Sequence, residues 1–321
     1  MLTIGILTVQ VLQNRLQLKD FRLIRAIYET GQLAIAAERM SLTQPAASRM
    51  LASIERLVGM TLFVRHPKGM TPTPAGEILA RNASGLLNGL EQTLQEVTAV
   101  TSGKAGSVRV GSVTGGAVAF VVPAIQELKA NAGSADIYVD VAPSDVLIQG
   151  LIDGEYDFVL SRLPPGTDSR QFNILTGRVE IIRFLVREGH PLANRKKLRL
   201  GELADFEWVM QAPRTPLRHA IEEAFLSQGI PSPQEIVNTT SLLVMISYLT
   251  TSDAIAPITQ EVVELLGPKV FGGRVAALDV SDSVIVTPYH LISRKHQLMS
   301  PLASRLRELV FAGLATGRHR D

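Results

Sequence analysis

The sequence predicts a mixed α/β protein with a small helical head, one long helix and a larger region of alternating strands and helices. Three observations support this organisation. Two short amphipathic helical patterns joined by a tight turn occupy residues 31–57, an apolar seam at helical spacing runs through residues 73–102, and strand-like and helix-like segments alternate after Gly106. Such alternation favours mostly parallel sheets with helices on both faces.

Composition suits a globular protein of two or three domains. The chain has 321 residues, of which 46% are hydrophobic, so it can bury a sizeable core. It has no cysteine, which excludes disulfides, thiolate zinc sites and cysteine nucleophiles and suits a reducing cytosol. We therefore expect a cytoplasmic protein.

The first seventeen residues, 1–17, are apolar but lack a charged leading region and a small-residue cleavage site, so no signal peptide is expected. The run is also too short and too interrupted to span a bilayer. We expect an N-terminal extension that is frayed or that reflects a misassigned start codon, and no membrane association.

Charge is distributed unevenly along the chain. Residues 1–75 contain nine Lys/Arg and four Asp/Glu, which leaves 23 basic and 26 acidic residues for the remainder. The head is therefore charged +5 and the body −3. A basic head on a mildly acidic body indicates one module that binds nucleic acid and one that avoids polyanions.

A cap and a proline mark the start of the second helical pattern in the head. Thr43 precedes Gln44 and Pro45, so its hydroxyl is expected to cap the free amides of the first turn, where proline is tolerated. Apolar residues then recur at helical spacing and predict the buried stripe, which consists of Ala47, Leu51, Ile54 and Val58.

The opposite face of this helix carries small and polar side chains. Gln44, Ser48 and Arg49 can donate hydrogen bonds to base edges or phosphates, and the small residues let the backbone come close. A helix inserted in the major groove of DNA needs both properties. The predicted face consists of Pro45, Ser48, Arg49, Ala52, Ser53 and Arg56.

Short elements flank this helix on both sides. Residues 33–40 predict a short alanine-rich helix, and residues 19–30 an earlier helix that Gly31 ends. The apolar face of the earlier helix is predicted as Phe21, Ile24, Ile27 and Tyr28. Two very short strands are expected around the turn at residues 66–69, where Arg65 and Lys68 would meet the phosphate backbone.

The strings AAERM and TQPAASR within residues 31–48, followed by LFVRHPKGMTPTPAGE, resemble the winged helix-turn-helix of LysR-type transcriptional regulators. The resemblance implies a module for double-stranded DNA over residues 18–76. Candidate DNA-binding residues are Gln32, Thr43, Gln44, Pro45, Ser48, Arg49, Ser53, Arg56, Arg65 and Lys68. Gln32, Ile35 and Ala52 differ from the residues usual at these positions in the family. These differences bear on which DNA sequence is recognised, not on DNA binding itself. The alternative is a generic three-helix bundle with core alanines.

One long helix is predicted from Thr73 to about Ser102. Its apolar seam consists of Ile78, Leu79, Leu86, Leu87, Leu90, Leu94, Val97 and Val100. A long helix with one apolar stripe needs a partner, and two copies packing together supply it, unless the stripe packs on its own chain. The resemblance likewise implies a linker and dimerisation helix over 77–106, in which residues 101–106 form a hinge.

After Gly106 the pattern predicts an α/β region. The expected strands are 108–111, 136–142, 156–161, 178–186, 208–211, 255–256, 275–278 and 289–294. The expected helices are 117–131, 144–153, 217–228, 241–251 and 300–314. The second series, from Trp208 onward, is long enough to form its own subdomain.

The family resemblance implies that residues 107–321 form a two-lobed, periplasmic-binding-protein-like effector domain. Lobe I would be 107–177 plus 287–321 and lobe II 178–286, with crossovers near Gly177 and Val286. The strings REGHPLA and WVMQAPRTPLRHAIEEAFLSQG resemble the subgroup named after the galactose-binding protein regulator. The resemblance also implies a homodimer that assembles to a homotetramer, contact with RNA polymerase, activation of a nearby operon and repression of the protein's own gene, in the nucleoid.

Ligands of open α/β sheets lie beyond the carboxyl ends of strands, against helix N-termini, where hydroxyls and free amides bind acceptor-rich groups. Arg162, Arg214 or Arg218 could pair a carboxylate. The alternative is that these hydroxyls only cap helices. Candidate effector-binding residues are Thr114, Gly115, Gly116, Ser144, Arg162, Thr215, Arg218, Thr239 and Thr240. A sugar, a sugar acid, an aromatic acid and a cofactor-like metabolite all remain open as the effector.

Enzymatic function is not expected. The six histidines show no metal-ligand spacing, and no phosphate-binding loop or Gly-x-Ser-x-Gly sequence occurs. No cofactor, metal or catalytic residue is therefore predicted. Two alternatives share the two-lobed fold, namely a solute-binding protein of a transporter and a cytosolic enzyme. The first would need an export signal and the second a catalytic cluster.

Overall fold

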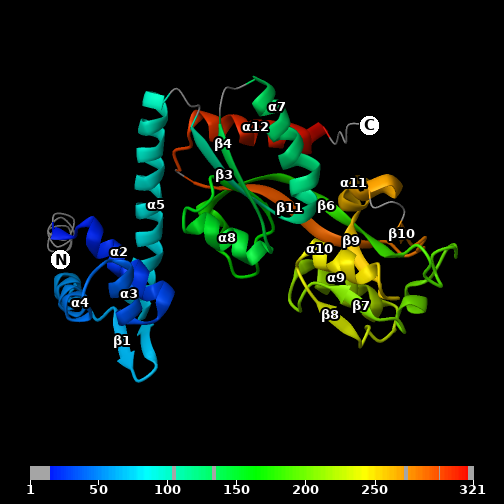
Figure 1. The fold of residues 1–321 in the computed structure, drawn as a ribbon, viewed down its shortest axis with the longest axis horizontal. Helices are drawn as coiled ribbons and strands as arrows, with labels where there is room; N and C mark the ends of the chain where they lie inside the picture. The colour runs from blue at the N-terminus through cyan, green and yellow to red at the C-terminus, as the bar shows by residue number, and fades with distance from the viewer. Residues whose placement is uncertain (1–14, 103–105, 132–134, 271–273, 296, 317–321) are drawn as a thin grey trace. The chain divides into compact units, whose positions relative to one another are not determined.

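Three helices form the head in the computed structural model, which describes residues 15–102, 106–131, 135–270, 274–295 and 297–316. They are α2 (Leu18–Thr30), α3 (Leu33–Arg39) and α4 (Gln44–Val58), as Figure 1 shows. Gly31 (φ 63°) and Gly59 (φ 74°) end α2 and α4 in the left-handed conformation that glycine adopts without strain. The predicted extension 1–17 lies almost entirely outside the described residues.

The apolar face of α2 differs in part from the prediction. Ile24 and Ile27 are buried as expected, but Tyr28 is exposed, and Leu23 is fully buried in its place. Since α2 packs on α3, α4 and α5, its buried face is wider than one stripe. The core of the head also contains Leu33, Ala36, Ala37, Ala47, Leu51 and Ile54.

A small β-hairpin follows the three helices. Strands β1 (Phe63–His66) and β2 (Gly69–Pro72) pair antiparallel around the predicted turn. Glu55 of α4 holds its base, because Glu55 Oε1 accepts hydrogen bonds from the Leu62 and Phe63 amides at 2.8 and 3.3 Å. We call this hairpin, residues 63–72, the wing.

The long helix α5 spans Pro74–Ser102, as predicted. Its apolar residues divide into two groups. Ala80, Ala83 and Leu87 are buried, and α5 packs against α2. A second group is more than half exposed, and it consists of Ile78, Leu86, Leu94 and Val97. The side chain of Val100 and part of the predicted hinge lie outside the described residues.

The chain divides into two compact units, residues 1–102 with 152–155 and residues 103–151 with 156–321. The larger unit contains a seven-stranded sheet in the order β10-β6-β11-β5-β3-β4, with β9 paired to β6, and a two-stranded sheet, β7-β8. The strands are β3 (Ser107–Ser112), β4 (Asp136–Val141), β5 (Phe158–Ser161), β6 (Phe172–Arg187), β7 (Trp208–Met210), β8 (Ile236–Asn238), β9 (Ala256–Thr259), β10 (Val275–Ala277) and β11 (Val284–Arg294).

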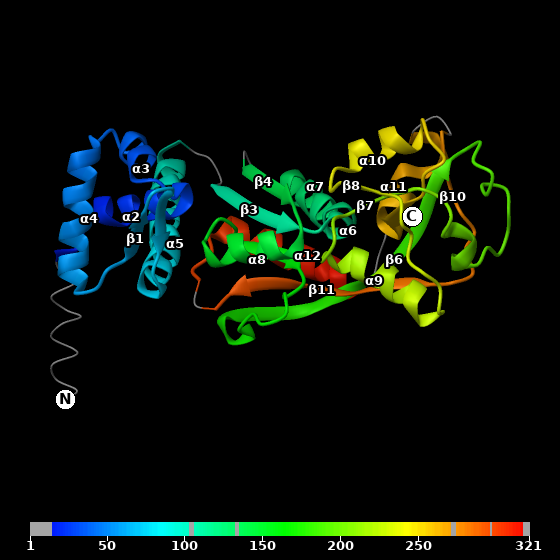
Figure 2. The same cartoon turned by 90° about the horizontal axis from the view of Figure 1, so that it is seen from below.

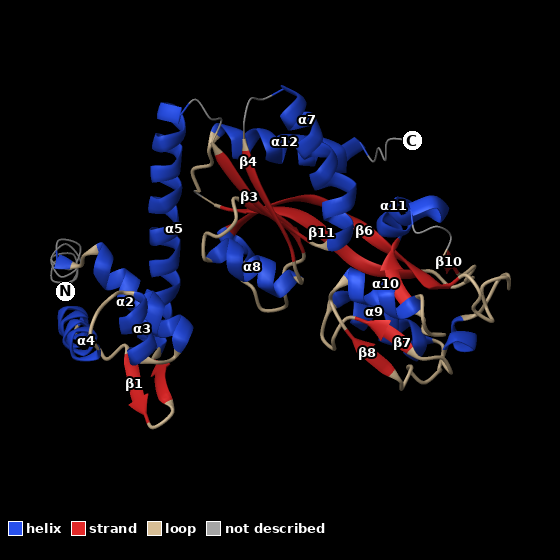
Figure 3. Cartoon of the chain, viewed as in Figure 1, coloured by secondary structure: helices blue, strands red, loops and turns tan. Residues whose placement is uncertain are grey.

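Helices cover these sheets, as Figure 3 shows. One helical run combines α6 (Thr114–Gly116), a π-helical turn (Ala117–Val121) and α7 (Val122–Asn131). The others are α8 (Ser144–Ile152), α9 (Pro216–Ser227), α10 (Leu242–Leu249), α11 (Gln260–Val270) and α12 (Pro301–Thr316). Two short 3-10 helices, Ser169–Gln171 and Leu200–Leu203, complete the unit. No helix of the described residues is long and apolar enough to cross a membrane.

Strands β6 and β11 are long and run side by side from one half of this unit to the other (Figure 2). Their pairing shifts register on both sides of Tyr289. Gly177 lies at this shift, where a Cβ would stand 1.4 Å from the Tyr289 carbonyl oxygen, so only glycine fits. The proposed lobe boundaries near Gly177 and Val286 fall on these two strands and stay predictions.

The strand predictions were wrong in three respects. Strand β6 begins at Phe172 rather than Arg178, and β11 at Val284 rather than Tyr289. The short strand β8 was not predicted. The large sheet is also not mostly parallel, since β6 and β11 pair antiparallel with each other and β6 pairs antiparallel with β9 and β10. Hydrogen bonding between β6 and β11 overrides the weak strand propensity of residues such as Asn173 and Gly177.

His190 is buried as a neutral ring in the turn that follows β6. Its Nδ1 accepts a hydrogen bond from the Leu192 amide at 3.0 Å, and its Nε2 lies 3.1 Å from the Asp253 carbonyl oxygen. The first bond requires an unprotonated Nδ1, so Nε2 carries the proton and donates it. Burial lowers the pKa of His190 below its usual 6.5.

Acid should therefore destabilise this unit through His190. Below pH 6.5 His190 binds a proton in the unfolded chain but remains neutral in the folded protein. The free energy of unfolding therefore falls as the pH decreases toward the folded-state pKa. His190→Asn retains an acceptor for Leu192 and removes the titration. Urea unfolding at pH 8, 7, 6 and 5 should show a steeper loss for the wild type than for this variant, and parallel pH profiles would contradict the assignment.

Candidate functional site

The exposed face of α4 carries most of the predicted DNA-binding residues. Ala47, Leu51 and Ile54 are buried on the opposite face, whereas Val58 is only half-buried. Nine of the ten candidates are exposed and Ser48 is half-buried. The exposed candidates are Gln32, Thr43, Gln44, Pro45, Arg49, Ser53, Arg56, Arg65 and Lys68. The exposed face of the helix is thus mostly polar and lies opposite its apolar, buried face.

Thr43 does not cap α4 through its side chain, contrary to the prediction. It occupies the N-cap position with extended backbone angles, but its hydroxyl makes no capping hydrogen bond. An N-cap side chain normally accepts from the second or third residue of the helix, and the second is Pro45, which has no N–H. Since Thr43 is exposed, its hydroxyl is accessible to a ligand of the head.

Arg65 turns toward α4 rather than standing alone on the wing. Its Nη2 donates a hydrogen bond to the Ser48 hydroxyl at 2.8 Å. Lys68, at the tip of the wing, is exposed. Arg65 and Lys68 were both predicted to contact the phosphate backbone, but in the structure Arg65 is hydrogen-bonded to α4 whereas Lys68 is exposed at the tip of the wing.

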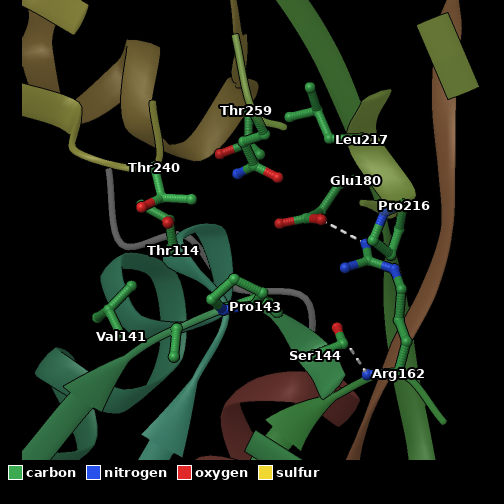
Figure 4. A pocket seen from close by; sticks show the side chains of 13 residues that line it. Thr114, Val141, Pro143, Ser144, Arg162, Glu180, Pro216, Leu217, Thr240 and Thr259 are labelled. Atoms are coloured by element: carbon green, nitrogen blue, oxygen red, sulfur yellow. Dashed lines mark hydrogen bonds and ion pairs between the residues drawn. The ribbon is translucent and has the colours of Figure 1, made fainter. Parts of the chain in front are cut away.

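A pocket of about 150 Å³ lies in the larger unit, where the turns after β3, β4, β5, β7 and β8 meet the side of β6 (Figure 4). Four of the nine predicted effector-binding residues line it, namely Thr114, Ser144, Arg162 and Thr240. Glu180, Gln211 and Thr259 also line it and were not predicted from the sequence. Its remaining walls are formed by Val113, Val141, Ala142, Pro143, Pro216 and Leu217.

Arg162, one of the three arginines predicted as a possible partner of a carboxylate effector, is already paired within the protein. Its Nη2 binds Glu180 Oε2, and both side chains are at least nine-tenths buried. Its Nε donates to the Thr287 carbonyl oxygen at 2.6 Å, and its guanidinium lies 5.7 Å from the centre of the Tyr289 ring. One arginine therefore connects β6, β11 and the end of β5.

Ser144 and Thr259 supply hydroxyls to this pocket. Ser144 begins α8, but its hydroxyl accepts from the Arg162 amide at 3.4 Å instead of capping that helix. The hydroxyl of Thr259 is buried and has no hydrogen-bond partner among the described residues. Both side chains are labelled in Figure 4. A ligand with hydrogen-bonding groups would satisfy the second hydroxyl.

Gly115 and Gly116 do not offer exposed amides, contrary to the prediction, because both residues are buried. A Cβ at Gly115 would stand 2.5 Å from Glu180 Oε1, and one at Gly116 would stand 2.9 Å from the Ser112 hydroxyl. These two glycines allow close packing behind the pocket. Gly115 in particular leaves room for the Glu180 carboxylate.

The other three predicted residues also do not line the pocket. Thr215 occupies the N-cap position of α9, but its hydroxyl caps no amide and instead donates to the Ala212 carbonyl oxygen at 3.0 Å. Arg218 is buried and pairs with Glu222 on the same helix. Thr239 accepts a hydrogen bond from the Ser241 amide at 3.1 Å. These contacts are structural.

Burial raises the pKa of Tyr289 far above its usual value, and the nearby Glu180 and Glu261 carboxylates raise it further. The phenol therefore stays neutral behind the pocket at any physiological pH.

No group of three or more His, Cys, Asp or Glu side chains among the described residues could hold a metal ion.

Family models match nearly the whole chain. The model of the bacterial regulatory helix-turn-helix protein, lysR family, matches residues 18–77. The model of the LysR substrate binding domain matches residues 101–315.

Similar proteins are transcriptional regulators. The chain is 36% identical to the HTH-type transcriptional regulator GbpR of Rhizobium radiobacter, over 78% of this chain and 83% of that protein. It is 31% identical to GbpR of Azospirillum brasilense, over 90% of this chain and 84% of that protein. These relatives belong to a family that is not enzymatic.

The fold matches a solved LysR-type regulator. Full-length CbnR, crystallised in a complex with its target DNA, superposes with a TM-score of 0.64 at 19% identity, covering 93% of this chain and all of that one. This likeness shows the fold alone. It agrees with a helix-turn-helix joined to a two-lobed α/β domain.

Proposed function

Since the chain belongs to the LysR-type transcriptional regulators, which bind DNA through a helix-turn-helix and a small effector through a second domain, we propose that α4 enters the major groove. The exposed face of α4 supports this role. Gln44, Ser48 and Arg49 on this face would read base edges, and Thr43, Pro45, Ser53 and Arg56 would contact the backbone. Lys68 at the tip of the wing and Gln32 would bind phosphates.

We infer that α5 pairs with a second copy of the chain. The exposed side chains of Ile78, Leu86, Leu94 and Val97 support this, because such an apolar row on a long helix is stable when a partner covers it. Two-fold pairing of heads predicts an operator with two inverted half-sites, and pairing of dimers would give the homotetramer.

We further propose that the effector is an uncharged, hydroxyl-rich small molecule held in the pocket around Glu180. Among the described residues that line the pocket, Arg162 is the one cation and Glu180 the one anion, and they pair with each other. A carboxylate effector would lose its hydration beside Glu180 without gaining an unpaired cation.

Hydrogen-bonding groups around the pair favour the same class of ligand. Thr114, Thr240 and Thr259 present hydroxyls, and Gln211 presents an amide. These groups can accept from and donate to a polyol, whereas the walls contributed by Val141 and Leu217 suit its C–H faces. Of the effectors that the sequence left open, a neutral sugar fits this lining better than a sugar acid or an aromatic acid.

A matched charge series tests this proposal. Calorimetric titration of the full chain with D-glucose, D-galactose, inositol, D-gluconate and benzoate should show binding of a neutral member and none of the two anions. Thr240→Val should weaken that binding about tenfold, as expected for one lost hydrogen bond, whereas Thr215→Val, outside the pocket, should not. Binding of an anion alone, binding of no neutral member, or equal effects of the two variants would overturn the proposal.

Effector binding would then shift the chain between arrangements of its subunits that hold the two half-sites differently. We propose that this change regulates transcription of a nearby operon and of the protein's own gene through contact with RNA polymerase. The site of action would be the nucleoid, in the cytoplasm. The effect of the bound effector on the DNase I footprint of full-length protein tests this coupling.

A further inference from the structure

The hydrogen bond between Arg65 and Ser48 joins two elements of the head. Arg65 belongs to β1 of the wing and Ser48 to α4, and the donor and acceptor are seventeen residues apart in the chain. Arg65 Nη2 donates to Ser48 Oγ at 2.8 Å. Because Ser48 lies on the face of α4 that is proposed to meet base pairs, this bond connects the wing to the reading surface.

The base of the wing is held firmly enough to keep Arg65 in place. Glu55, on the same helix as Ser48, binds the two amides at the start of β1. On the other strand, the Met70 amide donates to the Gly31 carbonyl oxygen at 2.7 Å. Gly69 packs so closely there that a Cβ would stand 2.3 Å from the same Gly31 oxygen. These contacts hold the backbone of the wing in place, and so they fix the position from which the Arg65 side chain reaches Ser48.

We propose that Arg65 is a positioning residue that makes Ser48 a hydrogen-bond donor toward DNA and so sets the base that Ser48 selects. This proposal rests on the assignment of α4 as the recognition helix. A hydroxyl has one proton and two acceptor lone pairs. Arg65 occupies one lone pair, and its positive charge turns the Ser48 proton away from the guanidinium, toward the open side of the helix.

A donor at this position discriminates among bases. Guanine presents two acceptors in the major groove, adenine and thymine present one each, and cytosine presents only its amino donor. The cytosine amino group would also approach the charged guanidinium of Arg65. The base facing Ser48 is therefore expected to be guanine most often and cytosine least often.

A phosphate contact by Arg65 is the rival role, and it makes different predictions. Losing a phosphate contact weakens binding to all sequences alike and lowers the salt slope by about one unit per subunit. Losing a positioning residue changes the base preference at one place in each half-site and leaves the salt slope nearly unchanged.

Sequence selection from a random duplex library with the full chain separates the two roles. The variants are Arg65→Met, which keeps the length of the side chain but not its donors, Arg65→Lys, Ser48→Ala and the double variant Arg65→Met/Ser48→Ala. Lys68→Met is the matched control for a basic residue on the wing. Thermal unfolding of each variant establishes that the head is folded, which is expected because Arg65 is exposed.

Arg65→Met and Ser48→Ala should lose discrimination against cytosine at the same position of each half-site, about tenfold in relative affinity. The double variant should lose no more discrimination than either single variant, and Arg65→Lys should restore part of it. Lys68→Met should lower the salt slope without changing base preference. Uniform weakening with a lower slope in Arg65→Met, or changes at different positions in the two single variants, would overturn the proposal. A wild-type chain that selects no sequence would instead refute the recognition helix itself.

Discussion

Replacing Arg49 with alanine is expected to abolish specific operator binding at concentrations that saturate the operator with wild-type protein. Arg49 is exposed on α4, beside Ser48 and one turn after Pro45. Loss of a good side-chain contact to a base costs about 1–3 kcal/mol. Because a dimer would lose it in both half-sites, affinity should fall on the order of 10²- to 10⁴-fold. Titration of the selected operator by fluorescence anisotropy measures this loss.

The control for this experiment is Arg22→Ala. Arg22 is also exposed but lies on α2, outside the proposed reading surface, so its loss should change operator affinity far less. Both variants should unfold at the wild-type temperature, since neither side chain is in the core. Unchanged operator affinity in Arg49→Ala, or equal losses in the two variants, would remove α4 from the role of recognition helix.

Replacing Arg162 with methionine is expected to destabilise the larger unit by about 3–5 kcal/mol. The change removes the partner of Glu180 and leaves a buried carboxylate uncompensated, which carries a penalty of this size. Adding Glu180→Gln to Arg162→Met should recover most of the loss, because no buried charge then remains. Trp208 is the only tryptophan in the sequence and is fully buried in this unit, so its fluorescence during urea unfolding follows the transition.

Arg170→Met is the matched control for Arg162→Met. Arg170 forms an ion pair with Asp168 at 2.9 Å, but its side chain is 87% exposed. Water screens that pair, so its loss should have little effect on stability. If Arg162→Met and Arg170→Met shifted the urea midpoint equally, or if Glu180→Gln gave no recovery, the buried pair would not have the role that its geometry indicates.

Local signals explain why the head was predictable. Gly31 ends α2 and Pro45 marks the first turn of α4, and both effects depend on the backbone conformation of the residue itself rather than on distant contacts. The failure at Thr43 has the same origin. The residue was correctly placed at the N-cap position, but the proline that signals a helix start also removes one of the two amides that a cap would bind.

Tertiary pairing explains what could not be predicted in the larger unit. Residues 172–177 form a strand because they pair with β11, and the local sequence does not show that this partner is present. The pocket depends on the same kind of information. Thr114 and Ser144 follow predicted strands and Thr240 precedes a predicted helix, so local position was enough to find them. Glu180 lies inside β6 and joins the pocket only after the fold brings it to Arg162. A glutamate among apolar strand residues was the available signal.

The arrangement of protected DNA tests the central claim most directly. Hydroxyl-radical footprinting of the full chain on its selected operator should show two inverted half-sites on one face of the duplex, with centres about 10 base pairs apart or a multiple of that spacing. This is the result expected if two copies of α4, joined through α5, enter successive major grooves. Protection of a single unrepeated half-site, or no protection of duplex DNA at low salt, would contradict the account.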